Sequence, residues 1–224
     1  WLKGLREAGV PEGEAQAICD RIAGFPAPVV AANTETSNRI IDVLLDALAP
    51  AMPGRAIAGS YGCAGVFALG GVDPERGKRF VHMETIGGGM GASPQGPGID
   101  GHRVHMGNTM NLPNESAEAG LPLRIEAYEF VEKSGGAGRH AGGMGACKVI
   151  RALADDIEFS LLYERALNPA QGAAGGAPGG AAAFAIEHVD GSRTPLSSKT
   201  PAGRLMKGEA LWIETAGGGG WGKP

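Results

Sequence analysis

The sequence ACKVIRALADDIEFSLLYE, residues 146–164, decides the fold class of this chain. Apolar side chains occupy every second position of its second arm, at Ile157, Phe159, Leu161 and Tyr163. A period of two is the side-chain period of a β-strand with one buried face. The first arm, 146–153, also has the composition of a strand, and a polar turn separates the two arms. The stretch therefore predicts an antiparallel hairpin.

Further strands are predicted at 79–86, 123–131, 182–189 and 211–217, with a shorter one at 102–106. Short strands with turn signals between them favour an antiparallel β region over βαβ units. Glycine provides 39 of the 224 residues, against a usual share of about 7%. We therefore expect an α+β fold, in which N-terminal helices precede a mainly antiparallel β region with long glycine-rich loops.

Two helices are predicted at the start of the chain. Residues 1–23 have a proline suited to a first helical turn, acidic residues beside it and a glycine stop signal. Residues 36–50 carry an apolar stripe at helical spacing, formed by Ile40, Ile41, Leu44, Leu45 and Leu48. We expect this stripe to face a core. The expected domains are a helical segment, 1–54, and a glycine-rich β domain, 55–224.

The charge and cysteine content exclude several classes of protein. The net charge is −4 and no run of Lys and Arg exceeds two residues, so we expect no nucleic-acid or membrane partner. No apolar run approaches the roughly 20 residues that cross a bilayer. Cys19, Cys63 and Cys147 are far apart and odd in number, which favours reduced thiols and a cytoplasmic location.

The glycine clusters do not form a nucleotide-binding motif. GGGMGA at 87–92 follows a predicted strand, but the dinucleotide fingerprint requires a helix to begin there, and SPQGPG cannot start one. The cluster at 134–148 lacks the Gly-Lys-Ser/Thr of a P-loop. Cys63 is a candidate nucleophile, but a small thiol among glycines is more often a buried apolar group. We therefore expect that this chain alone binds no ATP.

The most polar stretch is DGHRVHMGNTMNLPNESAE, residues 100–118. His102 and His105 are three positions apart, so on a strand they face opposite sides and would not share a metal ion. No complete set of metal ligands is visible. The asparagines of the stretch offer both donors and acceptors, which suits a polar substrate and a local turn equally well.

Five stretches of the chain, taken in order, resemble the motifs of one family. They are NTETSNRIIDVLLDAL, METIGGGMGA, DGHRVHMGNTMNLPNESAE, LPLRIEAYEFVEKSGGAGRHAGGMG and ETAGGGGWGKP. The family is that of hydantoinase B proteins, which includes the B half of ATP-dependent 5-oxoprolinase, and the resemblance is to their C-terminal part. This chain departs from the family pattern at Gly107 and at 112–115, so a different substrate preference is expected.

The resemblance implies a function within a complex. Family members work with an A-type partner that binds ATP and activates a cyclic amide by phosphorylation, and the B subunit completes the hydrolysis. ATP with Mg²⁺ and a divalent metal are thus implied elsewhere in the complex, and no cofactor is expected on this chain alone. The expected partners are the A-type subunit, the remaining N-terminal part of the B subunit and a small-molecule substrate. This chain alone is expected to be inactive.

The resemblance also places candidate site residues in the matching motifs. The expected catalytic residues are His105, Asn108 and Glu84, and the expected substrate-binding residues are Thr109, Asn111 and Asp100. Two alternatives remain open. One is a subunit of a related ATP-dependent carboxylase of acetophenone or acetone, and the other is a non-catalytic scaffold that docks the ATP-binding partner.

Overall fold

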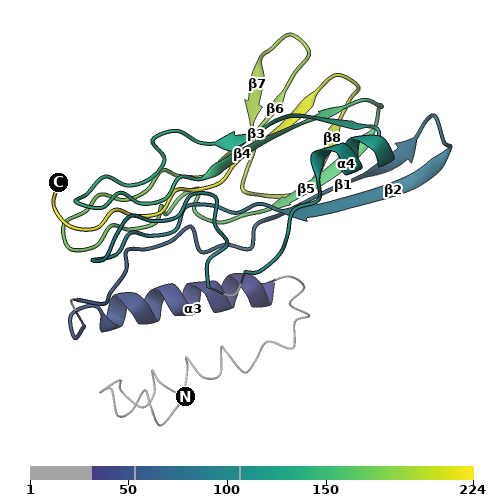
Figure 1. The fold of residues 1–224 in the computed structure, drawn as a ribbon. Helices are drawn as coiled ribbons and strands as arrows, with labels where there is room; N and C mark the ends of the chain where they lie inside the picture. Colours follow the sequence, from purple (N-terminus) through teal and green to yellow (C-terminus); the bar gives the residue numbers. More distant parts are fainter. Residues whose placement is uncertain (1–31, 53, 106) are drawn as a thin grey trace, which may run out of the picture. The chain divides into compact units, whose positions relative to one another are not determined.

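The computed structural model describes residues 32–52, 54–105 and 107–224, and residues 34–224 form one compact unit. The helices and strands of the described part follow in this order: α3 (Ala32–Leu48), β1 (Val66–Asp73), β2 (Lys78–Thr85), α4 (Asn114–Gly120), β3 (Leu123–Phe130), β4 (Ala146–Ala152), β5 (Ile157–Leu162), β6 (Ala183–Glu187), β7 (Arg193–Pro195), β8 (Lys199–Leu205) and β9 (Ala210–Glu214) (Figure 1). The helix predicted at 1–23 lies outside the described residues. The domain boundary predicted after residue 54 stays a prediction.

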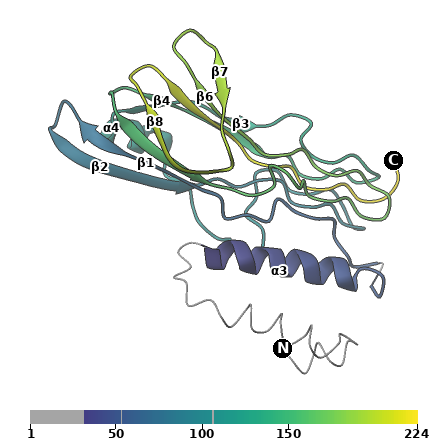
Figure 2. The ribbon, with the colours of Figure 1, turned by 180° about the vertical axis from the view of Figure 1, so that it is seen from behind.

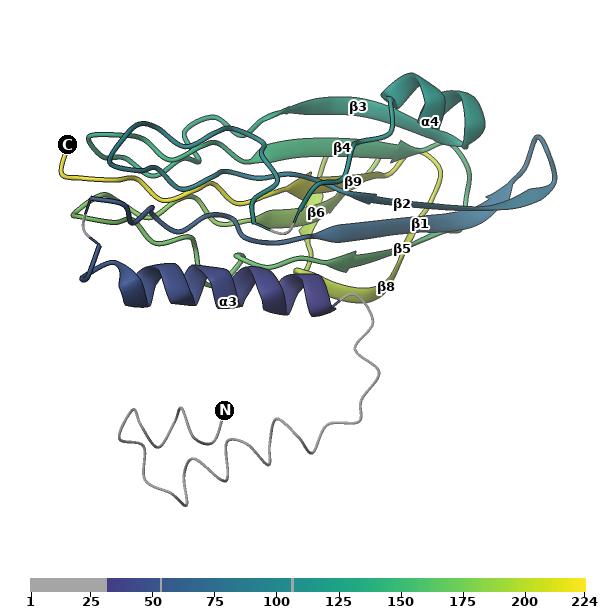
Figure 3. The same ribbon diagram turned by 60° about the horizontal axis from the view of Figure 1, so that its bottom comes forward.

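The strands form two antiparallel sheets, one in the order β2-β1-β5-β8 and one in the order β3-β4-β9-β6-β7. Figures 2 and 3 show the sheets as two layers. A single apolar cluster contains Phe67 and Phe159 from the first sheet and Ile150 and Leu211 from the second. The described part is therefore a β-sandwich with helices, and the expected mixed α+β fold with mostly β structure is confirmed.

The predicted hairpin at 146–164 is wrong. β4 pairs with β3 and β9, whereas β5 pairs with β1 and β8, so the two arms belong to different sheets. Asp156 in the connection has a φ of 57°, and the chain crosses there from one layer to the other. Alternation shows only that each arm buries one face, and that condition holds for a hairpin and for a crossing between sheets alike.

Most of the other predicted strands are present. β2, β3, β6 and β9 confirm the predictions at 79–86, 123–131, 182–189 and 211–217. In the predicted strand at 102–106, the described residues 102–105 do not form a strand, and they contribute an isolated bridge between His102 and Gly88. β1 and β8 were not predicted, because glycines interrupt β1 and both Pro201 and Gly203 lie in β8. β8 is an edge strand, where proline is tolerated.

Helix α3 confirms the helix predicted at 36–50, but its expected orientation is wrong. Ile40, Leu44 and Leu48 are exposed to 46%, 53% and 46%, whereas the polar Asn38 is 1% exposed. The Arg39 guanidinium donates to the carbonyl of Tyr61 at 3.0 Å. The Glu35 carboxylate accepts hydrogen bonds from the Ala64 N–H and the Cys63 thiol in the glycine-rich stretch before β1. Because the backbone groups of such a stretch need partners when they are buried, the polar face of α3 is the one that turns inward.

The glycine-rich stretches lie beside the sandwich as extended segments that run along one another (Figure 3). Residues 217–220 sit among them, and their four N–H groups donate to four different carbonyls. The acceptors are Gly180, Gly143, Gly59 and Ala177, at 2.8–3.1 Å. These bonds join segments that are far apart in the sequence, so the region is a bundle of chains held by their backbones. We name it the glycine bundle; its segments lie within 56–64, 87–101, 134–145, 170–180 and 215–222.

The packing around residues 217–220 repeats every three positions. A Cβ added at Gly217 or Gly220 would meet carbonyls of the same segment, at Ser134 and Ala137, 1.9 and 2.2 Å away. A Cβ at Gly218 would meet the carbonyl of Met90, 2.1 Å away. Three residues per turn is the period of a polyproline-II-type helix. Since every side of this segment touches another backbone, only glycine fits along the run.

Candidate functional site

Three cavities adjoin along the polar stretch 100–113. One of about 410 Å³ is lined by Gly87, Gly101, His102, Arg103, Gly107, Asn108, Thr109, Met110 and Asn111. A second, of about 360 Å³, shares Thr109, Met110 and Asn111 with the first and adds Glu84. A third, of about 470 Å³, shares Gly101 with the first and reaches Asp100 and Tyr128. We call the first of these the Arg103 cavity.

A buried ion pair lies behind these cavities, between the two sheets. The Lys148 ammonium donates to both carboxylate oxygens of Glu84, at 2.8 and 2.7 Å, and the two side chains are 1% and 5% exposed. His82 Nε2 lies 3.3 Å from the same carboxylate. Burial raises the pKa of Glu84, but the hydrogen bonds from His82 and Lys148 outweigh it and leave that pKa below its ordinary value. Glu84 is therefore an ionised carboxylate with a fixed orientation.

A chain of contacts joins this ion pair to the cavity walls. The Lys148 ammonium lies 5.1 Å from the centre of the Tyr128 ring, and the Tyr128 hydroxyl accepts a hydrogen bond from the Asn111 amide nitrogen. The Asn111 oxygen in turn accepts from Arg103 NH2 at 2.9 Å, and the same nitrogen donates to the carbonyl of Thr85. Both ends of the Asn111 carboxamide are thus held in place.

The structure brings most of the predicted site residues together. Glu84, Thr109 and Asn111 line one cavity, and Asn108 joins Thr109 and Asn111 in the Arg103 cavity. Asp100 lines the third cavity, and its carboxylate accepts a hydrogen bond from the backbone N–H of Met144 at 2.7 Å. Asp100 therefore also fixes the local loop.

His105 lies apart from that group. Its Nε2 is 2.9 Å from Asp42 of α3, and both side chains are about 10% exposed. Arg165 donates to the other oxygen of Asp42 at 2.6 Å. His105 has a φ of 56°, a left-handed backbone conformation that is uncommon outside glycine. His105 does not line any of the three cavities along the 100–113 stretch.

Sequence reasoning missed Arg103, Tyr128, His82 and Lys148. A signal was available for two of them. His82 and Glu84 are two positions apart on β2 and so share its inward face. Lys148 is one of two cations in the otherwise apolar β4, beside Arg151, and β4 lies between two other strands of its sheet. A cation and a carboxylate within two predicted, largely apolar strands indicate a buried pair.

The described cysteines have the character of buried apolar groups. Burial raises the pKa of Cys147 to about 12 and also raises that of Cys63. The Cys63 thiol donates to the Glu35 carboxylate at 3.5 Å. A thiol in this state supplies little thiolate near neutral pH, so the structure offers no support for Cys63 as a nucleophile.

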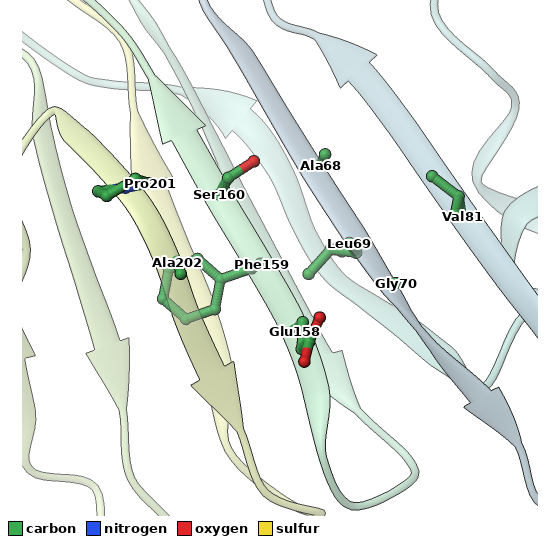
Figure 4. A pocket seen from close by; sticks show the side chains of 9 residues that line it. All are labelled: Ala68, Leu69, Gly70, Val81, Glu158, Phe159, Ser160, Pro201 and Ala202. Atoms are coloured by element: carbon green, nitrogen blue, oxygen red, sulfur yellow. The ribbon is translucent and has the colours of Figure 1, made fainter.

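A further hollow, of about 240 Å³, lies on the outer face of the first sheet (Figure 4). Its floor is formed by small residues such as Ala68, Gly70 and Ser160. Its single carboxylate, Glu158, faces solvent and pairs with Arg204. This hollow lacks the converging polar groups that line the cavities along 100–113.

Two further features bear on the function of the described residues, their metal ligands and the length of their helices. Those residues contain no group of three or more His, Cys, Asp or Glu side chains placed to hold a metal ion. None of the helices described is long and apolar enough to cross a membrane.

The pattern of the Hydantoinase B/oxoprolinase family matches residues 18–224. The chain belongs to this family. It is 39% identical over 202 residues to protein MJ0963 of Methanocaldococcus jannaschii, covering 89% of this chain and 34% of that protein. It is 35% identical over 196 residues to 5-oxoprolinase 1 of Arabidopsis thaliana, covering 88% of this chain and 14% of that protein. This chain thus spans about a third or less of the length of these relatives.

The fold of this family member is similar to that of ATP-dependent caprolactamase from Pseudomonas jessenii. The TM-score is 0.74 at 23% identity, over 89% of this chain and 36% of that one. At this level of identity the likeness concerns the fold. The sandwich and its neighbouring segments therefore share the architecture of that chain.

Proposed function

We propose that this chain is the C-terminal portion of the B subunit of an ATP-dependent cyclic-amide hydrolase of the hydantoinase/5-oxoprolinase type. Membership of the family supports the subunit type. The observation that carries the proposal is the set of cavities along 100–113 with the Glu84–Lys148 pair behind them. In the proposed assembly an A-type subunit binds ATP with Mg²⁺ and phosphorylates the amide, and this chain helps to complete the hydrolysis in the cytoplasm.

The proposed task of this chain is to bind and orient the activated amide. An unstrained amide is a poor electrophile, and phosphorylation of its oxygen creates a leaving group. The Asn108 carboxamide offers a donor and an acceptor, which match the C=O and N–H of a cyclic amide. Asn111 is held by Arg103 and Tyr128 and keeps one N–H and one oxygen lone pair for the same purpose. Glu84 adds a fixed negative charge to the wall of the adjoining cavity. Correct orientation of reacting groups removes a large entropic part of the barrier.

His105 is proposed to transfer a proton in the assembled enzyme. Asp42 holds its Nε2 at 2.9 Å and so orients the ring, and this arrangement leaves Nδ1 to exchange a proton with a reacting group. Because His105 lies outside the three cavities, another part of the assembly has to carry the reacting group to it.

A divalent metal is assigned to another part of the complex. The described residues of this chain do not provide a set of ligands that fits one. The proposed role of the chain therefore rests on binding, orientation and proton transfer by its own side chains.

The experiment is to assemble the native complex and measure ATP-dependent turnover of 5-oxoproline, hydantoin and caprolactam. Asn108→Ala and His105→Ala should each lower product formation about 10²–10⁴-fold, the usual range for a lost catalytic group. Asn168→Ala is the matched control, because Asn168 is exposed and lies outside these cavities. Unchanged turnover in both test variants would reject the proposed site.

The two alternative functions give different results in the same assay. A scaffold that only docks the partner predicts that excess A-type subunit restores full activity to Asn108→Ala. A ketone carboxylase predicts consumption of bicarbonate with acetone or acetophenone and no hydrolysis of the three cyclic amides. Either result would replace the proposed function.

A further inference from the structure

Arg103 differs from the other half-buried arginines of the described chain. Arg39, Arg151 and Arg165 each form an ion pair with a carboxylate at 2.5–3.2 Å. Arg103, which is half-buried as well, has no carboxylate partner among the described residues. Partial removal of a guanidinium from water is costly unless an opposite charge offsets the lost hydration. The missing counter-charge therefore requires an explanation.

The contacts of Arg103 leave part of its guanidinium facing the Arg103 cavity. NH2 donates one hydrogen bond to the carbonyl of Thr85 and one to Asn111 Oδ1. These two bonds use both hydrogens of NH2. Within the described part of the chain, NH1 and Nε have no hydrogen-bond acceptor. The arginine is thus anchored at one nitrogen and has donors available at the other two.

The wall of the Arg103 cavity contains no carboxylate. Its polar side chains are His102, Arg103, Asn108, Thr109 and Asn111, and glycines form much of the rest. Glu84 lines only the adjoining cavity and already has Lys148 as its counter-ion. In a chain of net charge −4, a cavity with a cation and no acid on its wall favours an anionic ligand.

We infer that Arg103 determines specificity by binding a carboxylate carried by the cyclic-amide substrate. This inference rests on the proposed function and narrows its substrate class to lactams that bear a carboxylate. Asn108 and Asn111, the groups proposed to hold the amide, line the same wall as Arg103. The anion and the amide therefore belong to one small molecule, and a guanidinium–carboxylate contact is a strong, charge-assisted hydrogen bond.

The test compares two lactams that differ only in the carboxylate: 5-oxoproline and 2-pyrrolidone. The assembled enzyme should prefer 5-oxoproline, and Arg103→Met should lower the ratio of the two kcat/KM values about 10- to 100-fold, mainly through the KM for 5-oxoproline. Arg103→Lys keeps the charge and should lie between the two. Arg204→Met is the matched control, because it removes an exposed arginine on another face. It should leave the ratio unchanged.

Each other outcome overturns the inference in a distinct way. An equal loss with both lactams assigns Arg103 to the phosphoryl group or to the local fold. A wild-type enzyme that hydrolyses 2-pyrrolidone as well as 5-oxoproline refutes the carboxylate preference and leaves the proposed function standing. An enzyme that hydrolyses neither lactam nor any other cyclic amide refutes the proposed function.

A binding measurement on the wild-type complex keeps the test independent of variants that fail to fold. Calorimetry without ATP should detect 5-oxoproline at least about tenfold tighter than 2-pyrrolidone. Without ATP no phosphoryl group is transferred, so a difference between the lactams reports the carboxylate alone. Equal affinities, or no binding of either lactam, would refute the inference.

Discussion

The sandwich and the glycine bundle are packed by different parts of the polypeptide. In the sandwich, side chains such as Phe67, Ile150 and Leu211 fill the space between two sheets. In the bundle, the run 217–220 touches neighbouring carbonyls directly, and hydrogen bonds between backbones join the segments. The packing of the sandwich thus depends on the size and shape of its side chains, and the packing of the glycine bundle depends on the absence of side chains.

The two regions should therefore respond differently to small changes. A core of side chains can shift or repack when one group is altered, at a cost set by the volume lost or gained. Backbones in hydrogen-bonded contact have less freedom, because a shift that accommodates one new atom also breaks bonds to several neighbours. Substitutions in the two regions test this difference, and the following four are ordered by expected effect.

The largest effect is expected from Gly218→Ala. The new Cβ would lie 2.1 Å from the carbonyl oxygen of Met90, and Gly218 also donates to Gly143 at 2.9 Å. We expect a loss of more than about 4 kcal/mol in the free energy of unfolding, measured by urea denaturation. Gly96→Ala is the control in the same bundle, since no atom lies within 4 Å of its added Cβ. Similar losses in both variants would contradict backbone packing as the cause.

The next effect concerns the polar pair inside the sandwich. Lys148→Met leaves the Glu84 carboxylate buried without its cation and should cost about 3–5 kcal/mol. The double variant Lys148→Met with Glu84→Gln removes both charges and should recover more than half of that loss. Urea denaturation of the two variants measures the difference. A double variant as unstable as the single one would show that the charges are not the cause.

A moderate effect is expected from an apolar truncation in the same core. Leu211 is fully buried, so Leu211→Ala should lower the free energy of unfolding by about 2–5 kcal/mol through lost burial and a residual cavity. The measurement is again urea denaturation, with an unchanged dependence of the free energy of unfolding on urea concentration (the m value). A loss below about 1 kcal/mol would mean that the sandwich repacks more freely than its burial indicates.

The smallest effect is expected from the same substitution on α3. Leu44 is 53% exposed, so Leu44→Ala should change the stability of this chain by less than about 0.5 kcal/mol. The chemistry is identical to Leu211→Ala, and only the burial differs. A loss as large as that of Leu211→Ala would show that the apolar face of α3 is covered in solution.

The local elements were predictable because their signals are local. Alternation at 157–163 reports a strand, since neighbouring side chains of a strand point to opposite faces. The helical spacing from Ile40 to Leu48 reports a helix for the same kind of reason. The motif NTMN at 108–111 contains three predicted site residues that line the same cavity, because residues close in sequence are held close in space.

The sequence by itself thus determined most of the strands, helix α3, the family and the polar stretch that lines the cavities. Only the tertiary structure decided which sheet each strand joins, which face of α3 turns inward, and that Lys148 meets Glu84 across the sandwich. The physical reason is that a sequence pattern reports only on neighbouring residues. A local pattern states that a face is buried, but the partner that buries it lies elsewhere in the chain. For α3 the partner is a glycine-rich backbone whose N–H and C=O groups need hydrogen bonds. The polar face of α3 supplies such bonds and therefore turns inward, whereas the apolar face cannot supply them.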